Sequence, residues 1–251
     1  MQKVKRYLKP IIITIFWLGI WQILSAIAGL SVLLPSPLET VNELKNLAVT
    51  PEFWRSVLYS VIRITIGFLL GVMLGTLTAA VSAFSKTIND FFLPIIQIIK
   101  ATPVASFIIL AVVWLRTGNV PSFTSMLMVF PIVWTNVKTG IKETDRSLLE
   151  MSDAFCVPKG KKFLKIYLPS VKPYFISAAT TAMGLSWKAG IAAEVICNPK
   201  MSIGSGIYSS KIYLETPKLF AWTAVVVLMS ISLEKIMLVL LKRGKKNDKL
   251  K

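Results

Sequence analysis

The sequence contains no histidine, and only two of its 251 residues are cysteines, Cys156 and Cys197. Without histidine, catalysis by a Ser–His or Cys–His pair is excluded, and so is a metal site built on imidazole. Two cysteines provide neither a disulfide framework nor a zinc site. We therefore expect no metal ion and no cofactor, and we do not expect the chain to be an enzyme in its own right.

The chain also lacks the glycine-rich loop that binds nucleotide phosphates. Gly160-Lys161 is the nearest pair, but the glycine that should stand five residues earlier is absent, and so is the Ser or Thr that should follow the lysine. Any nucleotide hydrolysis that this protein depends on must therefore take place in another polypeptide.

Apolar residues, by contrast, are abundant: 54% of the chain is hydrophobic and the mean hydropathy is +0.66. Soluble domains rarely reach such values, whereas a helix that crosses a bilayer needs about 20 apolar residues. Six segments have a suitable length and composition: 10–30, 57–84, 91–115, 121–137, 173–196 and 219–241. We predict an all-α polytopic membrane protein with six transmembrane helices, built as a single domain over residues 1–251 with its core at about 55–240.

The positive charges fall mainly at the ends of these segments. With both termini in the cytosol, 19 of the 29 lysines and arginines lie on the cytosolic side and 6 on the outer side, as the positive-inside rule requires. The net charge of +17 could indicate nucleic acid, but charges at segment ends indicate the lipid bilayer as partner and no nucleic acid. We predict a multi-pass protein of the plasma or inner membrane, with both termini cytoplasmic and a basic tail over 242–251.

One charged loop, at about residues 147–169, separates the fourth and fifth segments. We predict a helix over 147–155 that is broken at Pro158, and a second helix over 159–167 that stops at Pro169. Acidic residues near the start of the first helix are favoured by the helix dipole, and lysines fill the second. Two interpretations remain open: an amphipathic helix lying on anionic lipid, and a helix that fits into a groove on a partner protein.

Small residues inside the segments indicate close helix packing, and prolines indicate a nearby translocation pathway. Gly67, Gly71 and Gly75 recur at every fourth position, which favours close helix packing over a contact with substrate. Pro94 and Pro103 are expected to make the third segment discontinuous. Since a broken helix at membrane depth must be covered by protein or by a water-filled cavity, this segment is expected to lie near a translocation pathway.

Charges at membrane depth are costly and are usually functional. Lys188 and Glu194 lie six residues apart in the fifth segment, and so on different sides of a helix. For Lys188, two interpretations are equally open: it attracts an anionic substrate, or it pairs with a neighbouring segment or reaches the lipid headgroups. For Glu194 we favour a structural or gating role near the outer end of the pathway. Arg63 is expected to pair with an acid or a carbonyl group of a neighbouring helix.

The 147–169 loop resembles the cytosolic loop of ABC importer permeases, which has the pattern Glu-x3-Ala-x-Gly-x9-Ile-x-Leu-Pro. Cys156 stands where the family usually has glycine, and the residues that match are Glu150, Ala154, Ile166, Leu168 and Pro169. Other stretches are similar to the sulfonate, nitrate and taurine branch of these permeases, so the resemblance extends over about residues 10–240. These stretches are 33–37, 60–63 with Gly67 and Phe68, 101–103 with Trp114, 187–194 and 203–204.

The resemblance implies the fold of type I ABC importer permeases and a homodimer with two ABC ATPase subunits. The 147–169 loop would couple each copy to its ATPase, and an extracytoplasmic solute-binding protein would deliver a small solute. That solute would be a sulfonate, nitrate or taurine-like anion, although related permeases carry vitamin precursors. Two other classes remain open: a secondary transporter driven by an ion gradient, in which internal repeats are common, and an assembly protein without transport activity.

Overall fold

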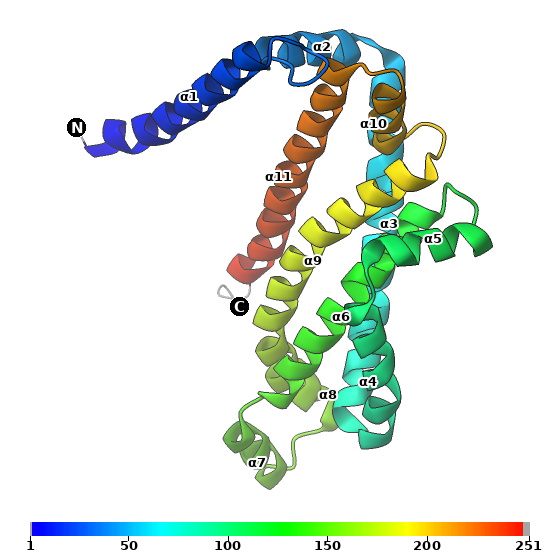
Figure 1. Cartoon of the computed structure of the whole chain (residues 1–251). Coiled ribbons are helices and arrows are strands. Elements are labelled where there is room, and N and C mark those ends of the chain that lie inside the picture. Colours follow the sequence, from blue (N-terminus) through cyan, green and yellow to red (C-terminus); the bar gives the residue numbers. More distant parts are fainter. Residues whose placement is uncertain (1, 248–251) are drawn as a thin grey trace.

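The structure is a computed structural model that describes the backbone of residues 2–247 and the side chains of residues 12–239. Throughout this part of the chain the regular structure is helical, which confirms the predicted class. The elements in chain order (Figure 1) are α1 (Gln2–Ala28), α2 (Pro37–Val49), α3 (Pro51–Phe84), α4 (Lys86–Ala101), α5 (Val104–Trp114), α6 (Val120–Lys142), α7 (Arg146–Ala154), α8 (Lys159–Lys162), the π-helix η1 (Phe163–Tyr167), α9 (Leu168–Cys197), α10 (Ile203–Ile212) and α11 (Thr216–Asn247).

Three helices of the described chain are long and apolar enough to cross a membrane: Pro51–Phe84, Val120–Lys142 and Thr216–Val239. The pair α4 and α5 is a fourth candidate if it counts as one span, although its halves are bent by 106°. The other two predicted segments are helical as well but do not reach this limit. The apolar part of α1 is short, and α9 is interrupted by serine, threonine, glycine and lysine.

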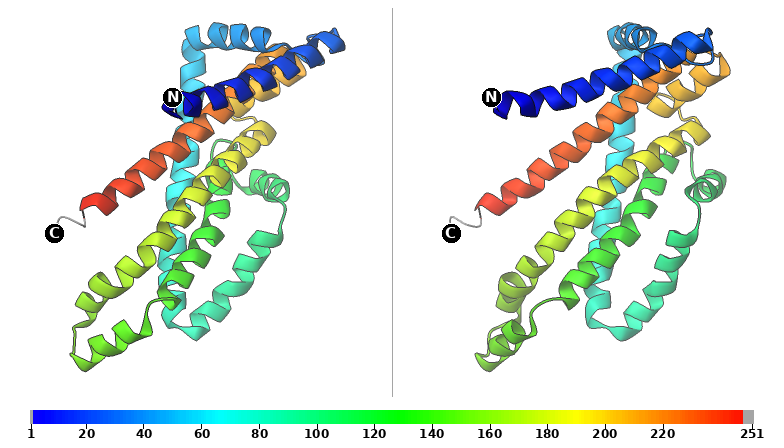
Figure 2. Two further views of the ribbon diagram at one scale, coloured as in Figure 1. Left: turned by 90° about the vertical axis from the view of Figure 1, so that its left-hand side faces the viewer. Right: turned by 60° about the vertical axis from the view of Figure 1, so that its left-hand side comes forward.

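The centre of the molecule consists of α3, α6 and α9, which pack against one another. α11 lies beside α9, and α4 and α5 lie beside α6 (Figure 2). α2 and α10 are at one end of the bundle, and α7 is at the opposite end (Figure 1). In Figure 1, α1 approaches the bundle near its own C-terminal end and extends away from it toward its N-terminal end.

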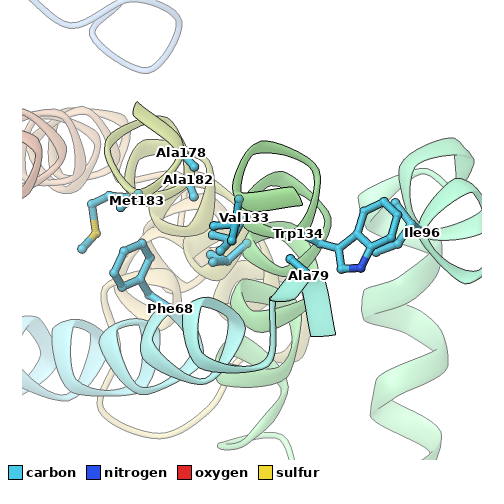
Figure 3. Close-up of a cluster of buried hydrophobic side chains, with 11 residues drawn as sticks. Phe68, Ala79, Ile96, Val133, Trp134, Ala178, Ala182 and Met183 are labelled. Atoms are coloured by element: carbon cyan, nitrogen blue, oxygen red, sulfur yellow. The ribbon is translucent and has the colours of Figure 1, made fainter. Parts of the chain in front are cut away.

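The glycine row of α3 allows close contact with α6. A Cβ atom added at Gly67 would lie 2.1 Å from a backbone carbonyl oxygen of α6, and one added at Gly71 would lie 2.7 Å from the Cβ atom of Val129. Gly75 meets Val133 in the same way. The adjoining core joins α3, α4, α6 and α9, and the side chains labelled in Figure 3 are Phe68, Ala79, Ile96, Val133, Trp134, Ala178, Ala182 and Met183.

The bend between α4 and α5 occurs at Thr102-Pro103. Pro103 has φ −58° and stands immediately before α5, and because it has no N–H the α4 hydrogen-bond pattern cannot run through it. Pro94, however, lies inside α4 without ending that helix. The expectation that both prolines interrupt this segment is therefore wrong for Pro94. A proline within a helix removes one hydrogen bond, and the flanking turns can preserve the rest.

The C-terminal helix reaches into the segment that was predicted as a basic tail. α11 continues to Asn247, so residues 242–247 extend the helix beyond its apolar part. The remainder of the tail, residues 248–251, lies outside the described residues.

Candidate functional site

The loop between α6 and α9 forms a helix of its own, α7, at one end of the bundle (Figure 1). Asp145 caps this helix: its carboxylate accepts a hydrogen bond from the Ser147 amide at 2.9 Å and another from the Ser147 hydroxyl. The hydroxyl first and the amide second stabilise the charged form, so the pKa of Asp145 lies below its usual value. α7 therefore has a fixed start, only a few residues beyond the end of α6.

Apolar side chains cover one side of α7, although the loop as a whole is charged. Leu148, Met151 and Phe155 are 43%, 51% and 78% exposed, and their spacing of three and four residues puts them on one side of the helix. Apolar anchors at such spacing are typical of a helix that fits into a groove on another protein. The family-like residues Glu150 and Ala154 are exposed as well.

The backbone turns sharply after α7. Cys156 has φ 51°, a left-handed conformation that glycine adopts at little cost. The amide of Cys156 donates to the Asp153 carbonyl at 3.0 Å, and the amide of Val157 donates to the Ser152 carbonyl at 2.9 Å. The glycine that related permeases usually have at this position therefore suits this turn, and the cysteine side chain is exposed on its outside.

The second short helix does not stop at Pro169, contrary to the prediction. α8 continues into η1, and η1 into α9, which begins at Leu168. Pro169 lies in the first turn of α9, where a missing N–H is tolerated because the preceding π-helical turn already changes the hydrogen-bond register. The loop therefore leads into α9 without a break. Ile166 is half-buried at this junction, whereas Leu168 and Pro169 are exposed.

The same junction also contacts α3 and α6. A small apolar cavity of about 100 Å³ separates η1 and the start of α9 from the C-terminal ends of these two helices. The ring of Tyr167 meets the ring of Phe84 edge-on, with centroids 5.5 Å apart. A displacement of the loop could thus be transmitted to α3, α6 and α9 through these contacts. The cavity is lined by Thr76, Ala80, Phe84, Val137, Ile141, Phe163, Tyr167, Leu168 and Val171.

A second feature runs along α4, α6 and α9. It begins with α4, whose sides differ in character. The side that includes Ile96 and Ile99 is buried. The side that includes Ile98, which is 62% exposed, is apolar. The third side carries Gln97 and Lys100, which are both exposed. An exposed apolar side suits lipid, whereas an exposed polar side at membrane depth requires water or protein beside it.

Lys100 connects this polar side of α4 to a row of polar side chains on α6. Its Nζ atom donates a hydrogen bond to Thr135 Oγ1 at 2.9 Å. Thr139 and Lys142 follow Thr135 at spacings of four and three residues, so all three lie on one side of α6. Thr139 and Lys142 are exposed, and Thr135 is half-buried.

A matching row lies on α9, where Ser177, Thr181 and Lys188 are exposed at helical spacing. The far side of α9 is covered by α3, since Gly190 packs directly against Ile64. Because α3 also covers the back of α6, the exposed rows of α4, α6 and α9 lie on the side of the molecule that faces away from α3. We call this set the polar face; its members are Gln97, Lys100, Thr135, Thr139, Lys142, Ser177, Thr181 and Lys188.

Glu194 lies in a different environment, near the C-terminal end of α9, and its side chain is 0% exposed. Its Oε2 atom accepts hydrogen bonds from the Ser60 hydroxyl at 2.7 Å and the Gly204 amide at 3.2 Å. Arg63 Nη1 lies 3.9 Å from Oε1 and the guanidinium also donates to two carbonyl groups of the loop before α10. The expected pairing of Arg63 with an acid of a neighbouring helix is confirmed, whereas its carbonyl partners belong to a loop. The cluster joins α3, α9 and α10.

The structure thus separates residues that the sequence had grouped as pathway candidates. Lys188 belongs to the exposed polar face, Glu194 to a buried cluster, and Pro103 to the bend that follows Lys100. The sequence reasoning did not identify Lys100 and Thr135 as candidates for the pathway. The polar spacing of Gln97 and Lys100 in an otherwise apolar segment was the signal that could have identified them.

Comparison with known proteins identifies relatives along most of the chain. A family profile described as "Binding-protein-dependent transport system inner membrane component" matches residues 67–246. SsuC of Bacillus subtilis (strain 168), a permease assigned to aliphatic sulfonate transport, is 25% identical over 86% of this chain and 80% of its own length. The nitrate import permease protein NrtB of Synechococcus elongatus is 27% identical over 77% of this chain and 73% of its own.

Solved structures share the fold at lower sequence identity. An amino acid ABC transporter matches with a TM-score of 0.62 at 16% identity, covering 80% of this chain and 97% of the other. The MetNI methionine ABC transporter, in inward-facing conformations, matches with a TM-score of 0.58 at 14% identity, covering 76% and 93%. With more than half of its residues matched by the family profile, the chain belongs to the inner membrane components of binding-protein-dependent transport systems, as a transport subunit and not as the ATPase.

Proposed function

We propose that the chain is the permease subunit of an ATP-driven importer for a small anion. A solute-binding protein releases the anion at the end of the bundle that carries α2 and α10, the anion passes along the polar face, and it leaves near α7. An ABC ATPase binds the 147–169 loop and drives the change between outward-open and inward-open states. Two copies of the chain act together.

The observation that carries this proposal is the exposed α7 with its apolar side. Leu148, Met151 and Phe155 gain nothing from facing water, and burial of such side chains in a partner's groove is favourable by about 1.5–3 kcal/mol each when it is complete. The cavity behind η1 supports a role in transmission, because the same loop contacts the inner ends of α3 and α6.

The polar face supports both the pathway and the pairing of two copies. Lysine and threonine side chains at membrane depth cannot face lipid without a large cost. A second copy that covers the polar face would enclose it as a shared aqueous pathway. Lysines are its only charged members, and nitrate and bicarbonate permeases are among the relatives of this chain. Both observations support a small anion as the solute.

We further propose six spans with both termini in the cytosol. α1 and α9 would complete the count, with their polar or short stretches protected by neighbouring helices. Cys156 tests this orientation directly, because its thiol is exposed on the 147–169 loop. In a Cys197→Ser background, a membrane-impermeant maleimide should label Cys156 in inside-out vesicles and leave it unlabelled in right-side-out vesicles. The opposite pattern would refute this topology.

Binding of the ATPase is tested by placing one charge on the apolar side of α7. We expect Leu148→Arg to abolish co-purification with the ATPase subunit and ATP-dependent uptake, because a charge would have to enter an apolar groove. The matched control is Leu38→Arg on α2, which changes another exposed leucine at the opposite end of the bundle. Retention of the ATPase by the Leu148→Arg protein would contradict the docking of α7.

A further inference from the structure

Lys100 occupies an unusual position for a lysine, exposed at the end of a largely apolar helix, at the bend between α4 and α5. At a rise of about 1.5 Å per residue it lies roughly 21 Å along the helix from Lys86, which begins α4. No acidic side chain in the described part of the chain lies within ion-pair distance of Lys100. Its charge therefore needs another partner.

Thr135 fixes the direction of the Lys100 ammonium group. The Thr135 hydroxyl donates its own hydrogen to the Pro131 carbonyl at 2.7 Å, so it can only accept from Lys100. One of the three ammonium hydrogens is used in this way. The other two remain available on the exposed side of the group. This arrangement holds a cation in place without neutralising it.

Neighbouring charges add to the positive potential at this point. Lys138 lies between α4 and α6, where it donates to Asn89 and lies 4.0 Å from the centroid of the Trp134 ring. Lys100 and Lys142 both repel the Lys138 ammonium, and Asp90 attracts it. Around Lys138, the charges of Lys100 and Lys142 thus outnumber that of Asp90.

Lys188 extends the same series toward the outer end of the bundle. It is exposed on α9, and in the described chain it forms no ion pair. Glu234 of α11 lies over Gly184, one turn below Lys188, but it stays outside ion-pair distance of that lysine. An anion that follows the polar face would thus meet Lys188 first, then Lys100, and then Lys142 at the inner end.

We propose that Lys100 and Thr135 form an anion-binding step midway along the polar face, specific for small oxyanions such as nitrate or bicarbonate. Lys100 supplies the charge and two hydrogen-bond donors, and Thr135 is a positioning residue that holds the ammonium group toward the pathway. This inference rests on the proposed function in one respect, namely that the solute passes along the polar face.

The test compares two adjacent positions of α4 in the assembled transporter in lipid vesicles. In a Cys156→Ser, Cys197→Ser background, Gln97→Cys places a thiol beside Lys100, and Ile98→Cys places one on the apolar side. Reaction rates are measured with an anionic and with a cationic methanethiosulfonate reagent. We expect the Gln97→Cys thiol to react faster with the anionic reagent, and the Ile98→Cys thiol to react with neither, because lipid suppresses the reactive thiolate.

Adding Lys100→Gln to the Gln97→Cys protein should lower the anionic-to-cationic rate ratio by roughly fivefold or more, as expected for a unit charge several ångströms away. Lys100→Arg should keep the ratio high. Nitrate or bicarbonate should protect the thiol, whereas chloride at equal ionic strength should not. Equal rates with both reagents, no reaction at Gln97→Cys, or a ratio that Lys100→Gln leaves unchanged would each overturn the proposal.

These rates separate the failure of this inference from the failure of the proposed function. If the site is correct but the importer function is wrong, the charge preference persists while uptake does not depend on ATP. If the function is correct but the site is wrong, ATP-dependent uptake persists in Lys100→Gln and the rate ratio does not change. Anionic lipid as the true ligand would appear as loss of the anionic preference in vesicles that contain anionic lipid, with no protection by nitrate, and this too would overturn the proposal.

Discussion

The buried cluster around Glu194 and the polar face around Lys100 both contain charges at membrane depth, but their surroundings are opposite. Glu194 is enclosed by Ser60, the Gly204 amide and Arg63, which all come from other elements or turns. Lys100 and Lys188 are exposed, and neither has an acidic partner within the described chain. In the Glu194 cluster, the charged groups connect three helices. On the polar face, the charged groups remain exposed and can interact with a ligand or a partner.

This difference shows that the cost of a charge in a membrane protein can be met in two ways. A charge surrounded by donors contributes to the fold, and its removal should unfold the protein. A charge left exposed contributes little to the fold and must be retained for another reason, since an unpaired cation at this depth is expensive. The two regions can therefore be distinguished by measuring stability and uptake separately.

The largest effect on stability is expected from Glu194→Ala. The substitution leaves Arg63 and two hydrogen-bond donors without their buried acceptor, which typically costs about 3–5 kcal/mol. Thermal unfolding of the detergent-solubilised protein should show a large loss of stability. Lys188→Ala on the same helix is the control and should unfold at nearly the wild-type temperature. Equal losses for both variants would remove the distinction between the two regions.

A smaller loss is expected from Gly67→Ala, which acts on the packing of α3 and not on charge. The added methyl group would collide with the backbone of α6, and overpacking of this kind costs about 1–3 kcal/mol. Gly19→Ala in α1 is the matched control, because a Cβ atom there meets nothing within 4 Å. The same thermal assay should rank Gly67→Ala well below Gly19→Ala, and a reversed ranking would be incompatible with the observed contact.

Lys188→Gln is expected to change transport without changing stability. Loss of one cation from the polar face should lower the uptake of an anionic solute about tenfold, equivalent to about 1.4 kcal/mol. Initial uptake rates in vesicles with the ATPase present measure this effect. Lys211→Gln on α10, an exposed lysine outside the polar face, provides the control. Unchanged uptake in the Lys188→Gln vesicles would exclude this residue from the pathway.

The smallest effect, and one of opposite sign, is expected from Cys156→Gly. Glycine adopts the left-handed conformation at this turn without strain, so the variant should gain up to about 1 kcal/mol in local stability. Slower hydrogen exchange of the α7 amides would measure this gain. Cys197→Gly at the end of α9 should instead lose a similar amount, because glycine disfavours a helix. Faster exchange in α7 of Cys156→Gly would contradict the strain at this position.

Much of the fold could be predicted because apolar length and proline position are local properties of the sequence. The helical class, the separate helix in the 147–169 loop and the bend at Pro103 all follow from such properties. The continuation of the chain through Pro169 could not be predicted, because it depends on a π-helical turn that no single residue type specifies. The number of spans depends on how α1 and α9 are covered by neighbouring helices, which composition alone does not reveal.

The candidate site could be predicted only where the spacing of residues along one helix determines their relative positions. Lys188 and Glu194 were expected on different sides of a helix from their spacing, and they are. Glu194 is the buried one of the two because the Ser60 hydroxyl and the Gly204 amide donate hydrogen bonds to it. Ser60 is 134 residues away from Glu194 in the sequence, so its contact with Glu194 cannot be read from local spacing. The hydrogen bond between Lys100 and Thr135 likewise joins residues from two segments, so it emerges only once the helices are packed.

The π-helical turn η1 has a consequence for the direction in which α7 is presented. One residue more than an α-helical turn requires is accommodated between Lys162 and Leu168. Deleting one residue there would convert the turn to α-helix and rotate everything before it by about 100° about the α9 axis. The apolar side of α7, formed by Leu148, Met151 and Phe155, would then face a different direction. The one additional residue of the π-helical turn therefore determines the direction in which the apolar side of α7 points, although η1 contains no buried residue.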